Sequence, residues 1–247
     1  MILKRGDGRL WEIDFLRGAA IIIMIFFHFL YDLKHFSIID WCLYSGIIPY
    51  LASIIPSIFI LFAGVAITIS YAKYKNNFSE KQIRIRFIKR GSFIFLLGLI
   101  ITVVSYIFLP DIFVVFGILH CIGLSIIFSI LFIKMSYLNL IFGFLIVGVG
   151  LYLKTLTFSF NWLIPFGFLP ENFAWLDFFP LFPWFGVLLI GISIGNLLYT
   201  NGKRKIQLKD LSSNFFVKPL CSMGRNSLLI YFLHQPILLA IIFLLIL

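Results

Sequence analysis

The stretch RGAAIIIMIFFHFLYD, residues 17–32, decides how the rest of the sequence is interpreted. Ten uncharged and mostly apolar residues separate Arg17 from His28, and Asp32 follows four residues later. A segment this apolar favours the hydrocarbon core of a membrane, where ionisable side chains are costly and mark functional positions. The stretch therefore predicts a transmembrane helix that carries chemistry along one edge.

The composition of the whole chain agrees with a membrane protein. Of its 247 residues, 62% are hydrophobic and only 12% are charged, and the mean hydropathy is +1.08. Soluble domains carry roughly 25% charged residues. Because the apolar runs are apolar all round rather than alternating, they favour helices over the strands of a barrel. We expect an all-α bundle in one domain, residues 1–247, that crosses the lipid bilayer of the cell membrane several times.

The charges predict how the bundle is oriented. A helix needs about 20 apolar residues to cross a bilayer, and seven stretches meet or approach this length: residues 14–33, 49–72, 92–109, 112–133, 138–153, 179–199 and 226–246. Of the 20 Lys and Arg residues, only Lys34 and Lys154 fall outside the segments on one side of these spans. The positive-inside rule then places the N-terminus in the cytoplasm and the C-terminus outside.

Several classes of function lack support in the sequence. The net charge of +10 follows the membrane topology, so we expect no nucleic acid partner. Cys42, Cys121 and Cys221 lack metal-ligand spacing, and we expect neither a metal site nor a disulfide framework. No GxGxxG or P-loop pattern is present, so no soluble nucleotide-binding module is implied.

The first span has a polar stripe. Arg17 and His28 are eleven residues apart, which in a helix is about 16.5 Å along the axis and about 20° around it. His28 and Asp32 lie one turn apart, and Asp14 and Arg17 nearly so. Gly18 allows close approach by a neighbouring helix or a ligand. The stripe either lines the interior of the bundle, or its outer members extend to the two membrane interfaces.

Two further polar positions have open interpretations. His120 is expected about eight residues inside its span, at a depth similar to that of His28, where two imidazoles would supply a base and a positioning group. The alternative is a structural histidine held by hydrogen bonds. Asp177 stands before Pro180 at the outer start of a span. It either binds an acceptor or orients a histidine, or Pro180 simply sets the start of the helix.

The last span carries a second polar face. Ser227, Tyr231 and His234 follow helical spacing and share one side. Arg225 and Asn226 are expected to open this helix on the cytoplasmic side, where N–H groups and an arginine suit a phosphate. The alternative is an arginine that anchors the helix at the interface, with hydrogen bonds between helices.

Two loops also remain open. Residues 73–90, KYKNNFSEKQIRIRFIKR, are strongly basic and attract either anionic lipid headgroups or the phosphates of a nucleotide-like ligand. Residues 154–178 are aromatic and nearly uncharged, and form either an interfacial anchor or a lid over a site.

Four stretches resemble the catalytic family of heparan-α-glucosaminide N-acetyltransferase: WEIDFLRGAAIIIMIFFHFLYD (11–32), GILH (117–120), DFFPLFPWFG (177–186) and GRNSLLIYFLHQP (224–236). An arginine followed after ten residues by a histidine is also similar to the acyltransferase-3 membrane family. The resemblance implies a transmembrane acyltransferase that uses a CoA thioester. Family enzymes usually have more spans than the seven counted here, and their proposed active histidine lies beyond the first span. The active residue therefore stays open between His28, His35 and His120.

Together these features predict an acetyltransferase that moves an acyl group from cytoplasmic acetyl-CoA to a hydroxyl or amine of an extracytoplasmic sugar, glycan or lipid-linked acceptor. His28 would act as base or acyl carrier. The alternative is a proton-coupled small-molecule transporter with the stripe as its relay. The resemblance also allows a homodimer. The expected catalytic residues are His28, Asp32, His120, Asp177 and His234, and those expected to bind the donor are Arg17, Gly18, Arg225, Asn226, Ser227 and Tyr231.

Overall fold

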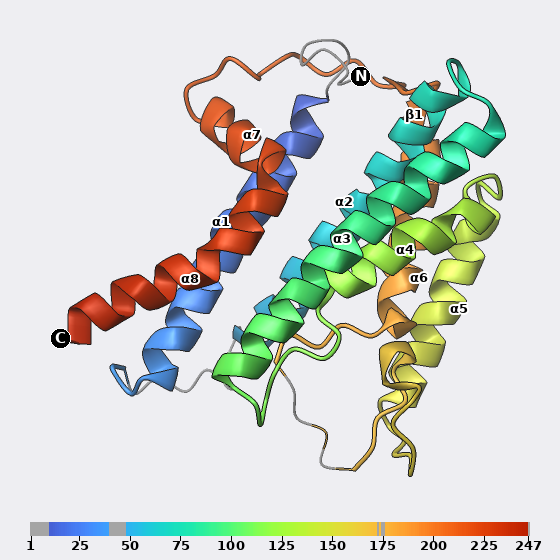
Figure 1. Cartoon of the computed structure of the whole chain (residues 1–247). Coiled ribbons are helices and arrows are strands. Elements are labelled where there is room, and N and C mark those ends of the chain that lie inside the picture. Colours follow the sequence, from blue (N-terminus) through green and yellow to red (C-terminus); the bar gives the residue numbers. More distant parts are fainter. Residues whose placement is uncertain (1–9, 40–47, 172, 174–175, 247) are drawn as a thin grey trace. The chain divides into compact units, whose positions relative to one another are not determined.

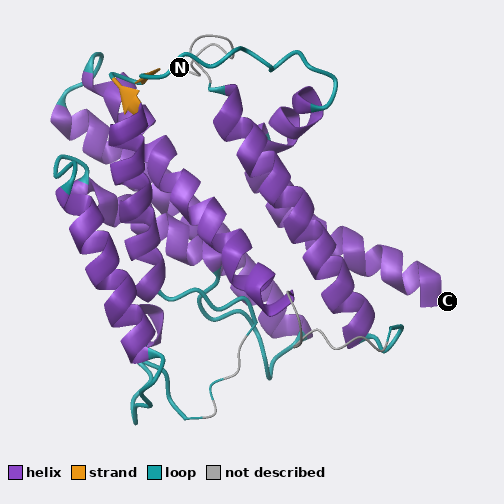
Figure 2. Ribbon diagram, turned by 180° about the vertical axis from the view of Figure 1, so that it is seen from behind, coloured by secondary structure: helices purple, strands orange, loops and turns teal. Residues whose placement is uncertain are grey.

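The computed structural model describes residues 10–39, 48–171, 173 and 176–246, so that Cys42 lies outside the described residues. Within these ranges the chain is almost entirely helical (Figures 1 and 2). The elements are α1 (Trp11–His35), α2 (Ile48–Lys75), α3 (Glu80–Phe108), α4 (Ile118–Phe132), α5 (Leu138–Leu153), the 3-10 helix η1 (Ile164–Phe166), α6 (Leu181–Leu198), β1 (Tyr199–Thr200), β2 (Lys203–Arg204), α7 (Val217–Arg225) and α8 (Ser227–Ile246).

The helices have the lengths and composition of a helical membrane protein. Among the described residues, five helices are long and apolar enough to cross a bilayer: Trp11–His35, Ser53–Lys75, Glu80–Phe108, Leu181–Leu198 and Ser227–Leu244. The helices α4 and α5 are apolar but shorter. The predicted class, an all-helical membrane protein, is confirmed, whereas the count of seven spans and the cytoplasmic N-terminus stay predictions.

Contacts divide the chain into two compact units. The first combines Met1–Phe59 with Gln207–Leu247, and the second is Ile60–Ile206. The prediction of one domain over residues 1–247 stays a prediction.

In the first unit, α7 packs closely against the first half of α1. A Cβ on Gly18 would overlap the main-chain carbonyl of Leu220, and a Cβ on Gly224 would overlap that of Asp14. These pairs show that the two helices run in opposite directions with their backbones in contact. Small residues permit this approach, which is a common way for helices to associate in membranes.

The helix α8 packs along the second half of α1 and runs in the same direction. The rings of His28 and His234 are neighbours, with centroids 4.9 Å apart. Further along both helices, the rings of Phe36 and Phe243 lie 5.4 Å apart. The part of the polar stripe with His28 and Asp32 therefore faces α8, as the first interpretation of the stripe expects for these two residues.

In the second unit, the helices also approach each other at glycines. Figure 1 shows α3 beside α4 and α5 beside α6. At the closest approaches both helices carry a glycine, and a Cβ on either glycine would overlap the backbone of the neighbouring helix. The absence of side chains at these glycines lets the helices pack closely. The closest pairs are Gly91 and Gly123 between α3 and α4, Gly143 and Gly186 between α5 and α6, and Gly64 and Gly191 between α2 and α6.

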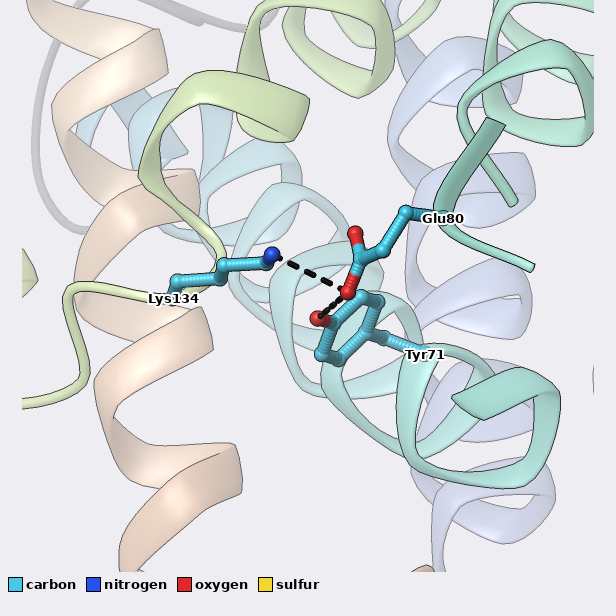
Figure 3. A network of polar contacts seen from close by, with 3 residues as sticks. All are labelled: Tyr71, Glu80 and Lys134. Carbon is cyan, nitrogen blue, oxygen red and sulfur yellow. Dashed lines mark hydrogen bonds and ion pairs between the residues drawn. The ribbon is translucent and has the colours of Figure 1, made fainter. Parts of the chain in front are cut away.

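A polar network joins three segments at one end of the second unit (Figure 3). The Nζ of Lys134, which follows α4, lies 3.0 Å from Oε1 of Glu80 at the start of α3. The hydroxyl of Tyr71, in α2, donates to the same oxygen over 3.2 Å. The end of α4 is therefore held beside the connection from α2 to α3.

Three expectations about element boundaries are wrong. The span predicted for residues 112–133 begins as a helix only at Ile118, because residues 109–117 form a loop. In this loop the N–H groups of Val114 and Gly117 bond to the side chains of Ser105 and His120. His120 consequently lies in the first turn of α4 and not eight residues inside it. The second error is the helix α7, which the sequence did not predict. The third is the loop expected at residues 73–90, because α2 continues to Lys75 and α3 begins at Glu80, where Ser79 caps the new helix.

A small sheet interrupts the otherwise helical second unit. The strands β1 and β2 pair Tyr199 with Arg204 in an antiparallel hairpin. Its two turn residues, Asn201 and Gly202, both have positive φ, which is typical of a two-residue hairpin turn.

Candidate functional site

The second half of α1 carries an imidazole whose hydrogen bond fixes its tautomer. Nδ1 of His28 lies 2.9 Å from the carbonyl oxygen of Met24, one turn earlier. A carbonyl only accepts, so Nδ1 holds the hydrogen and the neutral ring has its lone pair on Nε2. Among the described residues, this Nε2 has no hydrogen-bond partner. A half-buried imidazole in this state has the lone pair that a base or a nucleophile needs.

A second imidazole stands beside the first in the same state. His234 donates from Nδ1 to the carbonyl of Tyr231 in its own helix. Its Nε2 is buried and has no hydrogen-bond partner in the described part of the chain. The two rings are almost perpendicular, at 81°. Burying an unsatisfied polar atom is costly, so the pair is better suited to a bound ligand than to the empty protein.

Asp32 completes this cluster through a residue that the sequence did not single out. The Nε2 of Gln235 donates to both carboxylate oxygens of Asp32 over 2.9 Å each. Asp32 is only 4% exposed. The Oε1 of Gln235 is buried and unpartnered within the described ranges. We name His28, Asp32, His234 and Gln235 the imidazole cluster.

Asp32 does not set the tautomer of His28 in the structure. In the described part of the chain, no hydrogen bond joins the two side chains, and the Met24 carbonyl takes the proton instead. Asp32 nonetheless lies near enough to interact electrostatically with His28. Its place is thus that of a buried negative charge one turn away from the imidazole.

The residues expected to bind the donor lie at the other end of α1. Gly18 packs against the backbone of α7, and Arg17 beside it is half-buried. Ser227 and Tyr231 are half-buried in α8. Arg225 is the last residue of α7, so it does not open the final helix as expected. A cation suits this position because helix C-termini carry partial negative charge.

Asn226 also has a structural place. It forms the C-cap of α7, where its main-chain N–H bonds to the carbonyls of Ser222 and Met223. Its side-chain nitrogen donates to the carbonyl of Ser222 over 2.9 Å. Because these donors are engaged, Asn226 joins two helices rather than presenting its N–H to a phosphate. Its role in donor binding stays a prediction.

His120 and Asp177 belong to the second unit and hold the start of α4. Nδ1 of His120 accepts the N–H of Gly117 over 3.1 Å, and its Nε2 lies 3.4 Å from the hydroxyl of Thr102. The ring is 2% exposed. Asp177 accepts the N–H of Ile118 over 3.4 Å. Because both ring nitrogens of His120 are engaged, the geometry favours a structural role for His120 and Asp177. Their assignment as catalytic residues stays a prediction.

The fold and the imidazole cluster define an integral helical membrane protein with ionisable groups held between two helices. A model of the family described as heparan-alpha-glucosaminide N-acetyltransferase, catalytic, matches residues 9–236. The chain belongs to this family, which confirms the resemblance seen in the sequence and makes it a member of a transferase family. No curated protein and no solved structure matches the chain. The matched range includes every residue of the imidazole cluster.

Proposed function

We propose that the protein is a membrane-embedded acetyltransferase. It moves an acetyl group from cytoplasmic acetyl-CoA to a hydroxyl or amine of a sugar, glycan or lipid-linked acceptor outside. Family membership supports the transfer reaction. The observation that carries the proposal is the state of His28, whose Nδ1–H is tied to Met24 and whose Nε2 is left with a lone pair beside His234.

His28 has two ways to promote transfer. As a general base, its Nε2 takes the proton of the acceptor while the acceptor oxygen or nitrogen attacks the thioester carbonyl. The C–S bond breaks, and the proton passes to the departing CoA thiolate. As an acyl carrier, Nε2 itself attacks the thioester, the C–S bond breaks and CoA leaves as the thiolate. The acceptor then attacks the acetyl group, the bond from the acetyl carbon to Nε2 breaks, and the acceptor's proton passes to the thiolate. Both routes need the tautomer that the Met24 carbonyl selects.

The other members of the cluster stabilise charge on His28. Either route makes the imidazole cationic for part of the reaction. The buried carboxylate of Asp32 lowers the cost of that charge. Gln235 holds the carboxylate in place through its amide nitrogen. The unpartnered Nε2 of His234 and Oε1 of Gln235 are acceptors for O–H or N–H groups of a bound acceptor.

The donor would bind at the opposite end of α1. Arg17 and Arg225 offer guanidinium groups for the phosphates of CoA, and Gly18, Asn226, Ser227 and Tyr231 lie on the same two helices. Arg17 and His28 are separated by about 16.5 Å along the helix axis, a distance that the pantetheine arm of CoA is long enough to cross for the most part. This arrangement requires the N-terminus to be cytoplasmic and the bundle to cross the cell membrane.

The test uses purified full-length protein, radiolabelled acetyl-CoA and a panel of amino sugars and polyols. Wild type should transfer label, and His28→Ala should not. His35→Ala is the matched control, because His35 lies exposed at the end of the same helix. Loss of activity in His35→Ala alone would assign the reaction to that histidine. A wild type that consumes no thioester, but carries out proton-coupled uptake in liposomes that depends on His28, would replace the enzyme with a transporter.

A further inference from the structure

A basic pocket lies where the end of α2 meets the first part of α3 in the second unit. It is lined by Tyr74, Arg86, Phe87, Lys89 and Arg90 and has a volume of about 260 Å³. The three cations follow the spacing i, i+3 and i+4 and therefore share a helix face. All three are exposed. Three positive charges thus converge on one hollow.

No acidic side chain of the described residues neutralises these charges through an ion pair. Glu80 is the only acid in residues 73–90. Its Oε1 forms an ion pair with Lys134 and accepts a hydrogen bond from Tyr71 (Figure 3). The basic pocket therefore keeps a net positive charge that favours an anion.

Arg86 is held in an orientation suited to a phosphate. Its guanidinium carbon lies 3.8 Å from the centre of the Phe78 ring and 5.6 Å from that of Tyr74. A guanidinium that stacks on a ring keeps its N–H groups directed outward in its own plane, where they match a phosphate in pairs. The hydroxyl of Tyr74 makes no hydrogen bond to any described residue and adds another donor.

An exposed apolar surface continues from the basic pocket along α3. Lys89, Phe93 and Leu96 follow the spacing i, i+4 and i+7 and lie on one face. Phe93 and Leu96 are each 56% exposed. The predicted span begins at residue 92, so this surface leads from the pocket into the hydrocarbon region. A ligand that fits both parts has a phosphate joined to an apolar chain.

We propose that the basic pocket binds the phosphate of an anionic glycerophospholipid, whose acyl chain lies along Phe93 and Leu96. Two interactions act together there: the electrostatic attraction of the basic residues to an anionic membrane surface, and paired hydrogen bonds from the guanidinium of Arg86 to the phosphate. The phosphates of CoA offer the same chemistry but have no chain to cover the apolar surface. This site does not rest on the proposed transfer reaction, because it contains no member of the imidazole cluster.

The experiment titrates purified full-length protein in detergent with phosphatidylglycerol and with phosphatidylcholine, and reads bound lipid by native mass spectrometry. Arg86→Gln/Arg90→Gln should weaken binding of phosphatidylglycerol roughly 25-fold, at about fivefold for each cation removed. Lys81→Gln/Arg84→Gln removes the same number of charges from exposed positions of α3 outside the pocket, and should change the affinity no more than about twofold. Arg86→Lys should fall between, since it keeps the charge and loses the fork.

Three results would overturn the proposal. Equal losses in the two double variants would mean diffuse attraction to the helix. Equal affinity for the two lipids would remove the need for net negative charge. Displacement of the lipid from wild type by CoA or by 3′,5′-ADP would assign the basic pocket to the donor. Arg86→Lys, which keeps the charge, and a helical circular dichroism spectrum of each variant show that a loss of binding is not caused by misfolding. The acetyl-transfer assay tests the imidazole cluster separately.

Discussion

The imidazole rings of His28 and His234 lie 4.9 Å apart and nearly perpendicular to each other. Each ring gives its Nδ1 hydrogen to a carbonyl of its own helix, three or four residues earlier. The same atom, Nε2, is therefore left without a partner among the described residues in both rings. Two separate helices thus present matching lone pairs at one place, which neither helix provides alone.

We expect Arg17 and His28 to divide donor binding from chemistry. Arg17→Ala should weaken CoA binding, because it removes a charge-assisted contact to phosphate. His28→Ala should leave CoA binding unchanged and lower the single-turnover rate by about 10²- to 10⁴-fold, the usual contribution of a base. Isothermal titration with CoA measures the first effect and rapid-quench transfer the second. Equal loss of CoA binding in both variants would show that this division is wrong.

We expect Gln235 to position Asp32. Gln235→Leu leaves a buried carboxylate without its amide donor, and should lower the free energy of unfolding by about 1–3 kcal/mol as well as the transfer rate. Thermal unfolding in detergent reads the first effect. Gln207→Leu is the control, because Gln207 is exposed in the same unit.

A double-mutant cycle separates positioning from general damage. If Gln235 acts through Asp32, Gln235→Leu should cost much less in an Asp32→Asn background, since the charge that needs the donor is already absent. Strictly additive losses would mean that the two residues act independently.

The first helix was well predicted because its information is local. The spacing from Asp14 to Asp32 places the stripe on one face, and the structure sets His28 and Asp32 of that face against α8. Gln235 was missed although it follows His234 directly, because its role depends on Asp32, which is 203 residues away in the sequence. No periodicity reports such a pairing.

The helix α7 was missed for a different reason. Its sequence, VKPLCSMGR, is too polar and too short to be seen as a span. What holds it is contact with α1 at Gly18 and Gly224, and a sequence shows small residues without showing what approaches them. His120 was placed too deep because the apolar loop before it has the hydropathy of a helix.

We expect Gly224 to be indispensable for the contact between α1 and α7. Gly224→Ala places a methyl group against the main chain of Asp14, which cannot yield as a flexible side chain does. The variant should unfold several degrees below wild type. In contrast, a Cβ on Gly148 of α5 meets nothing within 4 Å. Gly148→Ala should be neutral or slightly stabilising, because alanine restricts the unfolded chain and favours the helix. Similar melting temperatures for the two variants would contradict the close contact.

Cys221 offers a pH-dependent report on the same contact. Its thiol donates to the carbonyl of Trp11 over 3.4 Å, and the residue is 1% exposed. Burial raises the pKa of the Cys221 thiol, and the negative charge of Asp14 raises it further. Below that pKa the thiol is neutral, so the reactive thiolate appears only as the pH rises through the raised value. Maleimide labelling, read by peptide mass spectrometry, should be slow at pH 7.5 and should still be accelerating above about pH 8.5, where an ordinary thiol is already half ionised. Gly224→Ala should speed labelling at pH 7.5, because it loosens α7 from α1. Rapid labelling of wild type at pH 7.5 would mean that the thiol is open to solvent and that α1 does not cover it.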